Sequence, residues 1–130
     1  HLRPRRQRQM CIRDRFFDEQ LQAEADVDLQ GFSMVGLNER LRFYKYSEGE
    51  RFARHSDIPF DKSDTERSLL SVIIYLNDDF DGGETTFDDG TVRPQTGHAI
   101  VFAHELMHEG LPVSNGTKRV LRTDVMGQSK

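Results

Sequence analysis

Three side chains of this 130-residue chain could together bind one metal ion and leave part of its coordination sphere open. His55 and Asp57 are two residues apart, and on a strand such residues point to the same face. His108 lies 51 residues beyond Asp57 and completes a set of two histidines and one carboxylate. This set suits non-heme Fe(II) oxygen chemistry, because a cosubstrate and O2 can both reach the open metal positions. Lys118, ten residues after His108, could hold the far carboxylate of a small diacid.

A second metal-binding pattern overlaps the first, because His104 and His108 enclose an H-E-x-x-H sequence. On a helix, this spacing places both histidines on one face for zinc, with Glu105 as the general base of a metallopeptidase. The setting is unfavourable, since residues 98–103 are strand-like and Pro112 would end a helix soon after it began. A zinc metallopeptidase therefore stays as an alternative.

Short strands must position these side chains. The segments concerned are rich in β-branched and aromatic residues and are mostly bounded by turn-forming residues. Many short strands at this spacing indicate a sandwich or barrel, and so a mainly β fold. The polar loop over residues 56–68 is long enough to form a lid or a substrate-facing insert. The expected strands cover residues 41–46, 51–55, 69–77, 85–87, 98–103, 110–113 and 118–126.

One short helix is expected before the strands. Phe17, Leu21 and Ala25 recur every four residues with acidic residues between them, which predicts an amphipathic helix within residues 16–29. We therefore expect three parts in the chain. These are a basic segment (1–15), a helix and connector (16–36), and a functional domain (37–130).

Charge is distributed very unevenly along the chain. Residues 1–15 contain six arginines and one aspartate, whereas the remainder carries a net charge of −9 and the whole chain −4. The basic segment resembles translated adapter sequence, so we expect it to be non-native or disordered and the native N-terminus to be missing. The acidic remainder argues against a nucleic-acid partner.

Cysteine content and apolar run length exclude two further classes of protein. The single cysteine, Cys11, rules out an intrachain disulfide and lies in the basic segment, which favours an intracellular location. The longest apolar stretch, residues 69–76, is far shorter than the roughly 18 residues that a membrane span needs. No membrane partner is therefore expected.

Four stretches carry a family resemblance: YKYSEGERFARHSD (44–57), SVIIYLNDDFDGGETTF (71–87), VRPQTGHAIVF (92–102) and HEGLPVSNGTKRVLRTDV (108–125). In this order they are similar to the prolyl 4-hydroxylase-like branch of the 2-oxoglutarate- and Fe(II)-dependent dioxygenases. The resemblance runs from about residue 38 to residue 128. It implies that the β fold is a double-stranded β-helix, a jelly roll of the cupin type.

The same resemblance implies roles for individual side chains. Lys118 would pair with the C5 carboxylate of the cosubstrate 2-oxoglutarate. Tyr75 matches a position whose hydroxyl meets that carboxylate, and Tyr46 matches a pocket tyrosine near the cosubstrate. For both tyrosines, plain core packing is the alternative, since strand tyrosines are common. The iron ligands would be His55, Asp57 and His108.

Arg122 is a further candidate on the last expected strand. Lys118, Arg122 and Asp124 alternate along that strand and share a face, so an inward Lys118 implies an inward Arg122. Arg122 could help to bind a carboxylate of cosubstrate or substrate. It could equally form an ion pair with Asp124 or with an acid of the 56–68 loop.

The expected function is hydroxylation of an unactivated C–H bond, with release of succinate and CO2. Fe(II) is the expected metal, 2-oxoglutarate and O2 are the cosubstrates, and ascorbate is a further expected cofactor. The substrate is expected to be a prolyl or other residue of a peptide or protein, with a small molecule as the alternative. A non-catalytic jelly-roll module that keeps the ligands without activity is the other alternative.

Overall fold

In the computed structural model of the chain, residues 7–11 and 31–130 are described, and they form twelve β-strands and no helix. The mainly β fold is therefore confirmed, whereas the expected helix over residues 16–29 lies outside the described residues. Strand β1 (Gln7–Cys11) falls in the basic segment and pairs with β9 (His98–Ala103). The three-part division of the chain stays a prediction. Within the described residues, no helix could span a membrane.

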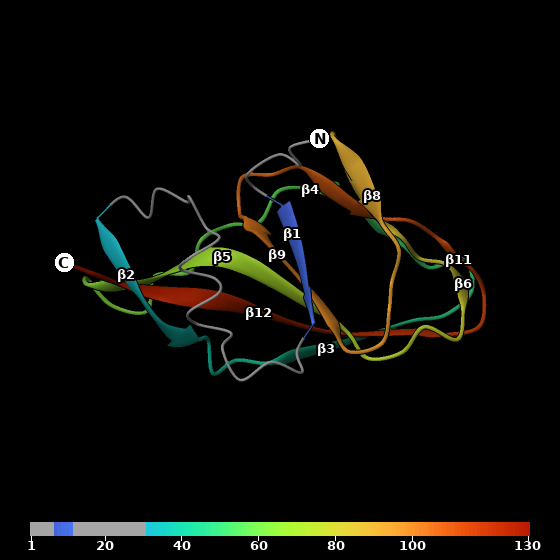
Figure 1. Cartoon of the computed structure of the whole chain (residues 1–130), viewed down its shortest axis with the longest axis horizontal. Coiled ribbons are helices and arrows are strands. Elements are labelled where there is room, and N and C mark those ends of the chain that lie inside the picture. The colour runs from blue at the N-terminus through green and yellow to red at the C-terminus, as the bar shows by residue number, and fades with distance from the viewer. Residues whose placement is uncertain (1–6, 12–30) are drawn as a thin grey trace.

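The larger sheet is built around two long central strands, β5 (Glu66–Tyr75) and β12 (Lys118–Ser129). One edge of β5 pairs with β9, which in turn pairs with β1. The free edge of β12 pairs first with β3 (Arg42–Tyr46) and then with β2 (Phe32–Leu37). The strands β3 and β2 thus lie one after the other along a single long strand (Figure 1).

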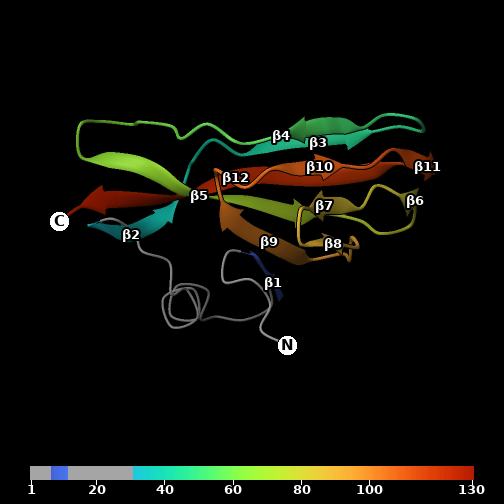
Figure 2. The same cartoon turned by 90° about the horizontal axis from the view of Figure 1, so that it is seen from above.

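A smaller sheet covers one face of the larger one. Figure 1 shows β4 and β8 along one side of the molecule and β3 and β12 along the other, and in Figure 2 β10 overlies β12. Two curled antiparallel sheets in this arrangement form the expected jelly roll. The smaller sheet has the order β4 (Phe52–His55), β10 (His108–Gly110), β7 (Thr85–Phe87) and β8 (Gly90–Val92), and β6 (Asp81–Gly82) pairs separately with β11 (Val113–Asn115).

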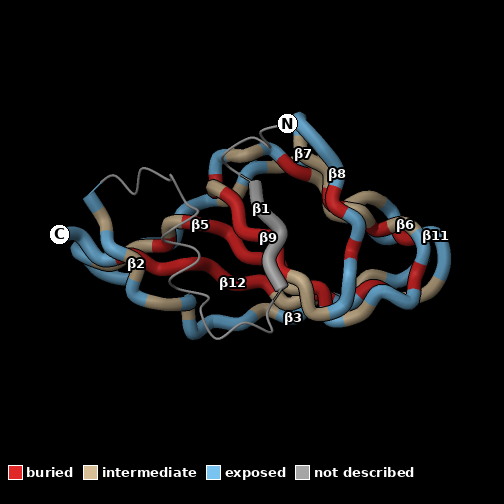
Figure 3. Tube along the Cα trace, in the orientation of Figure 1, coloured by how far each residue is buried: buried red, intermediate tan, exposed pale blue. Residues whose placement is uncertain are grey.

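Both faces of the central strands are buried, because alternate side chains of a strand point to opposite faces. One set packs between the two sheets and the other forms a second cluster on the opposite face. Figure 3 shows the buried stretches along β5, β9 and β12. The strands that carry the site are thereby held on both sides. The first cluster contains Ile73, Tyr75, Val92, Ile100, Phe102 and Val120, and the second Leu70, Val72, Ala99, Val101 and Val125.

Some strand boundaries differ from those expected. The expected strand over residues 110–113 is wrong, because β10 ends at Gly110 and β11 begins at Val113. Pro112 lies between them, and proline has no N–H to donate to a strand ladder. Strand β2 was not expected, because Gly36 within it resembles a turn signal in the sequence. In the structure Gly36 has a positive φ of 145° and lies within the strand.

Candidate metal centre and adjoining pocket

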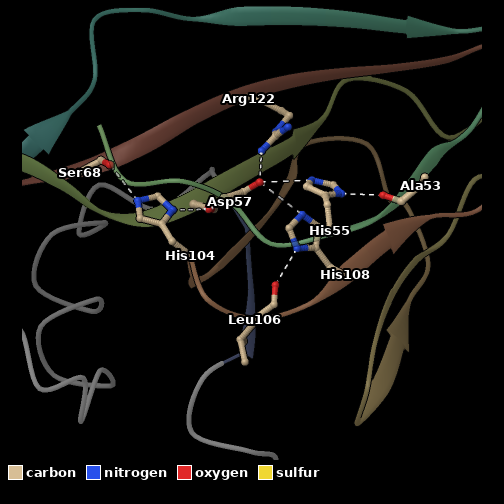
Figure 4. A network of polar contacts seen from close by, with 9 residues as sticks. Ala53, His55, Asp57, Ser68, His104, Leu106, His108 and Arg122 are labelled. Atoms are coloured by element: carbon tan, nitrogen blue, oxygen red, sulfur yellow. Dashed lines mark hydrogen bonds and ion pairs between the residues drawn. The ribbon is translucent and has the colours of Figure 1, made fainter. Parts of the chain in front are cut away.

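Strand pairing brings the two predicted histidine ligands together. His55 ends β4 and His108 begins β10, and the two are direct partners across that antiparallel pair. Their ring centroids lie 4.2 Å apart. Asp57 follows in the loop, where its N–H donates to the carbonyl of His104 at 2.9 Å. The metal-binding atoms of the two histidines and Asp57 all lie within 4.8 Å of one another (Figure 4).

Backbone carbonyls orient both imidazole rings. Nδ1 of His55 lies 2.7 Å from the oxygen of Ala53, and Nδ1 of His108 lies 2.9 Å from that of Leu106 (Figure 4). Because a carbonyl can only accept, Nδ1 carries the proton and Nε2 keeps its lone pair. Burial lowers the pKa of His108, although the Leu106 carbonyl and the charge of Asp57 oppose this change. The ring is therefore neutral near pH 7, as a metal ligand must be.

The carboxylate of Asp57 is held in its charged form by two neighbours. Nη2 of Arg122 lies 3.0 Å from Oδ1, and the hydroxyl of Ser71 donates to Oδ2 at 2.5 Å. Burial alone would raise the pKa of Asp57, but the Ser71 hydrogen bond and the Arg122 charge together outweigh it and lower the pKa below its usual value. Oδ1 also faces Nε2 of His55 at 3.2 Å and Nε2 of His108 at 3.7 Å.

This donor set fits Fe(II). Within the part of the chain that the structure describes, Nε2 of His55 is the one buried side-chain nitrogen or oxygen without a hydrogen-bond partner. A buried nitrogen without a partner is costly, and a metal ion would relieve that cost. Two imidazoles and one carboxylate on one side of an ion leave its other positions open.

A pocket extends from the two histidines to Lys118 and has an empty volume of about 360 Å³. Lys118 is only 5% exposed, and its Nζ donates to the carbonyl of Gly83 at 2.7 Å. Burial lowers its pKa to about 8, with Glu84 opposing the change. Among the described residues, no carboxylate lies within ion-pair distance of this ammonium group, so the pocket favours an anionic ligand.

The two predicted tyrosines occupy different places. Tyr46 pairs with Lys118 across β3 and β12 and lines the pocket, with Nζ 5.2 Å from its ring centroid. Tyr75 is fully buried, and its hydroxyl bonds to that of Thr85 at 2.7 Å. Thr85, rather than Tyr75, lines the pocket. Sequence reasoning missed Thr85, although the expected strand over residues 85–87 contained it, and the roles of both tyrosines stay predictions.

Arg122 lies between this pocket and a wider groove, and lines both. Of the partners left open by the sequence, the structure has an acid of the 56–68 loop, Asp57, in ion-pair contact with it. Asp124 instead accepts a hydrogen bond from Nδ2 of Asn38 at 3.2 Å. Binding of Arg122 to a carboxylate of cosubstrate or substrate stays a prediction.

The groove opens beside two of the candidate metal ligands, His55 and Asp57, and has an empty volume of about 950 Å³. Part of its wall is the start of the 56–68 loop, where Ile58 is 89% and Phe60 46% exposed. Exposed apolar side chains next to the candidate metal centre are available to contact a ligand. Asp61, farther along the loop, faces a basic neighbour and lies 3.5 Å from Arg67.

The H-E-x-x-H segment is not helical. Residues 104–107 connect β9 to β10 as a turn. The ring of His104 is buried and contacts Ser71 and Ser68, on the far side of Asp57 from His108 (Figure 4). A zinc metallopeptidase needs both histidines on one helix face, so this alternative is not supported.

Comparison with known proteins points to one family. Residues 41–123 match the 2OG-Fe(II) oxygenase superfamily. A PKHD-type hydroxylase of Xanthomonas campestris is 33% identical over 88 residues, which cover 58% of this chain and 39% of that protein. The chain thus spans about two fifths of the length of such curated relatives.

Solved structures agree with the fold. A prolyl 4-hydroxylase from Pseudomonas putida has 26% identity and a TM-score of 0.56, and the match covers 86% of this chain and 63% of that one. A viral collagen prolyl hydroxylase from Paramecium bursaria Chlorella virus-1, solved as its 2OG complex, has 19% identity and a TM-score of 0.55. That match covers 97% of this chain and 82% of the other. At such identity it supports the jelly-roll fold alone.

Proposed function

The chain belongs to the 2OG-Fe(II) oxygenase superfamily, and we propose that it acts as a 2-oxoglutarate-dependent hydroxylase of the prolyl 4-hydroxylase-like branch. One observation carries the proposal. The pocket that contains the buried ammonium group of Lys118 is also lined by His55 and His108. A diacid bound to a metal at one end can reach a buried cation with the other only if both lie in one pocket.

Each part of the site then has a distinct task. Fe(II) would be held by His55, Asp57 and His108, and Lys118 would bind the far carboxylate of 2-oxoglutarate. When bound, the iron and 2-oxoglutarate supply the oxidising power that inserts one atom of O2 into a C–H bond, with release of succinate and CO2. The chain's own residues hold these groups in place and exclude water. The buried side chains of Ile73 and Val120 form an apolar part of the pocket wall.

The groove beside Asp57 is the proposed place of the substrate. It is larger than the cosubstrate pocket and is bounded by the exposed side chains of Ile58 and Phe60. A prolyl or other residue of a peptide is the proposed substrate, because similar proteins include a PKHD-type hydroxylase and a prolyl 4-hydroxylase. Ascorbate is proposed as an accessory reductant, which its omission from turnover assays would test.

Anaerobic titration with Fe(II) and 2-oxoglutarate tests the metal and cosubstrate roles together. A visible metal-to-ligand charge-transfer band is expected, and Asp57→Asn should weaken or abolish it. Asp64→Asn is the matched control, because Asp64 is exposed in the same loop and lies outside the site. A folded wild-type protein that gives no band would contradict the proposal.

Two further measurements separate the rival functions. Succinate formation from 2-oxoglutarate distinguishes a hydroxylase from a non-catalytic jelly-roll module, which would bind the metal without turnover. Glu105→Gln should leave that turnover nearly unchanged, because Glu105 is exposed and does not line the pocket. A zinc metallopeptidase would instead lose its activity with this substitution.

A further inference from the structure

We propose that His104 is a positioning residue, which fixes the carboxylate of Asp57 through a chain of hydrogen bonds that begins at the backbone of the neighbouring loop. The inference rests on the proposed function in one respect, since Asp57 is taken as a metal ligand. His104 itself lies outside the ligand set.

Four contacts make up the chain. The N–H of Phe60 donates to Oγ of Ser68 at 2.7 Å. Oγ of Ser68 lies 2.9 Å from Nε2 of His104, and Nδ1 of the same ring lies 2.6 Å from Oγ of Ser71. The hydroxyl of Ser71 then contacts Oδ2 of Asp57 at 2.5 Å (Figure 4 shows the ring between Ser68 and Asp57).

The groups at the two ends of this series of hydrogen bonds fix the direction in which every bond is donated. An ionised carboxylate can only accept, so Ser71 gives its single hydroxyl proton to Asp57 and must accept from His104. Nδ1 of His104 therefore carries the proton, and Nε2 accepts the hydroxyl proton of Ser68. Ser68 in turn accepts from the N–H of Phe60, which can only donate. Every donor and acceptor that takes part in these four hydrogen bonds is satisfied in this arrangement.

The chain decides which oxygen of Asp57 is available to a metal. Ser71 occupies Oδ2, whereas Oδ1 faces Nε2 of both His55 and His108. The carbonyl of His104 also accepts the N–H of Asp57 at 2.9 Å, so His104 restrains both the backbone and the side chain of this residue. Partners of this kind orient ligands and raise metal affinity.

The rigidity of this arrangement comes from the central strands. Ser68 and Ser71 lie on β5 and are 2% and 1% exposed, and His104 directly follows β9, the neighbour of β5. The N–H of Ser68 also donates to the carbonyl of Phe60 at 2.8 Å. The groove wall at Phe60 and the Asp57 carboxylate are thus anchored to the same strand.

The test uses Co(II) as a spectroscopic probe of the metal-free chain. Ser71→Ala and His104→Leu are each expected to lower Co(II) affinity about tenfold or more and to change the visible d–d absorption. The double variant should bind no more weakly than Ser71→Ala alone, because His104 acts through Ser71. His104→Asn, whose amide can donate from near the Nδ1 position, should recover part of the affinity. Thr123→Val is the matched control, since it removes a buried hydroxyl that takes no part in these four hydrogen bonds.

The outcomes separate this inference from the proposed function. Co(II) affinity at the wild-type level in His104→Leu, or additive losses in the double variant, would overturn the positioning role and leave the proposed function intact. A wild-type chain that binds no Co(II) would contradict both. If His104→Leu does not fold, as judged by circular dichroism, Ser68→Ala provides the same comparison because it removes the donor to Nε2.

Discussion

Substitution of Lys118 by methionine should change how the stability of the protein depends on pH. The ammonium group is buried and, among the described residues, its hydrogen bond is to an uncharged carbonyl, that of Gly83. Burial is the main cause that lowers its pKa to about 8, from 10.5 for an ordinary lysine, and Glu84 opposes the change. The folded state therefore favours the neutral amine, and protonation of Lys118 destabilises the fold in the absence of a bound anion.

These two pKa values define the pH window and the magnitude. Above pH 10.5 the amine is neutral in both states, so Lys118 adds no pH dependence there. Between pH 10.5 and about 8 the unfolded chain binds a proton that the folded chain does not, so stability falls as pH falls, by about 1.4 kcal/mol per pH unit. Below pH 8 the effect levels off, at a total of roughly 3 kcal/mol.

Urea unfolding at a series of pH values between 7 and 10.5 measures this effect. As the pH is raised from 7 to 10.5, the free energy of unfolding of the wild type, relative to that of Lys118→Met, should rise by roughly 3 kcal/mol. Comparison of the two proteins removes contributions from other groups that titrate in the same range. Lys45→Met is the matched control, because Lys45 is exposed on the adjacent strand β3. A difference between wild type and Lys118→Met that stays constant with pH would refute the reasoning.

The same buried charge predicts the opposite effect on cosubstrate binding. An anionic carboxylate needs the charged ammonium group, so 2-oxoglutarate should bind best below pH 8, and its affinity should fall about tenfold per pH unit above it. Lys118→Met should bind 2-oxoglutarate weakly at every pH in this range. Isothermal titration of the metal-loaded proteins measures both profiles, and identical profiles would exclude Lys118 as the carboxylate partner.

Two other substitutions test packing and a buried hydrogen bond by urea unfolding. In Gly127→Ala, the new Cβ would meet Cδ1 of Leu69 and lie 2.7 Å from its Cγ. We therefore expect the free energy of unfolding to fall by about 1–3 kcal/mol. Unchanged stability would show that Leu69 moves freely. Tyr75→Phe removes the buried hydroxyl contact with Thr85, so a loss of about 1 kcal/mol is expected, together with weaker 2-oxoglutarate binding if Thr85 reorients. A gain in stability would contradict this role of the Tyr75 hydroxyl.

The candidate ligand set was accessible to sequence reasoning because its evidence lies in spacing. His55 and Asp57 are separated by one residue, and His108 falls at the position that the family pattern requires. Most of the strands were likewise visible as short β-branched and aromatic segments, and the expected strand over residues 98–103 matches β9. These are properties of neighbouring residues in the chain, which a sequence displays directly.

The support of Asp57 was not accessible in the same way. Ser71 interrupts an apolar stretch in the sequence, and a buried hydroxyl needs a partner, but the partner depends on how distant segments meet. His104 lies in a pattern that resembles a zinc motif, and only the turn between β9 and β10 shows that its ring points to Ser68 and Ser71. Thr85 was likewise hidden, because no local signal indicates which strand side chain reaches a pocket.

The two cations of the site are set at a defined separation by a single strand. Lys118 and Arg122 are four residues apart on β12, which corresponds to roughly 13 Å along an antiparallel strand, and their side chains line the same pocket. β12 pairs with β5 on one edge and with β3 on the other, with Lys118 opposite Tyr46 and Arg122 opposite Arg42. A slip of one residue in this register would turn both cations out of the pocket. The ladder with β3 is unbroken from Lys118 to Arg122, and the ladder with β5 begins at Val120 and is unbroken through Arg122 to Val125. The spacing of Lys118 and Arg122 along the pocket is therefore a property of strand pairing, because both side chains are carried by β12 and held in register by β3.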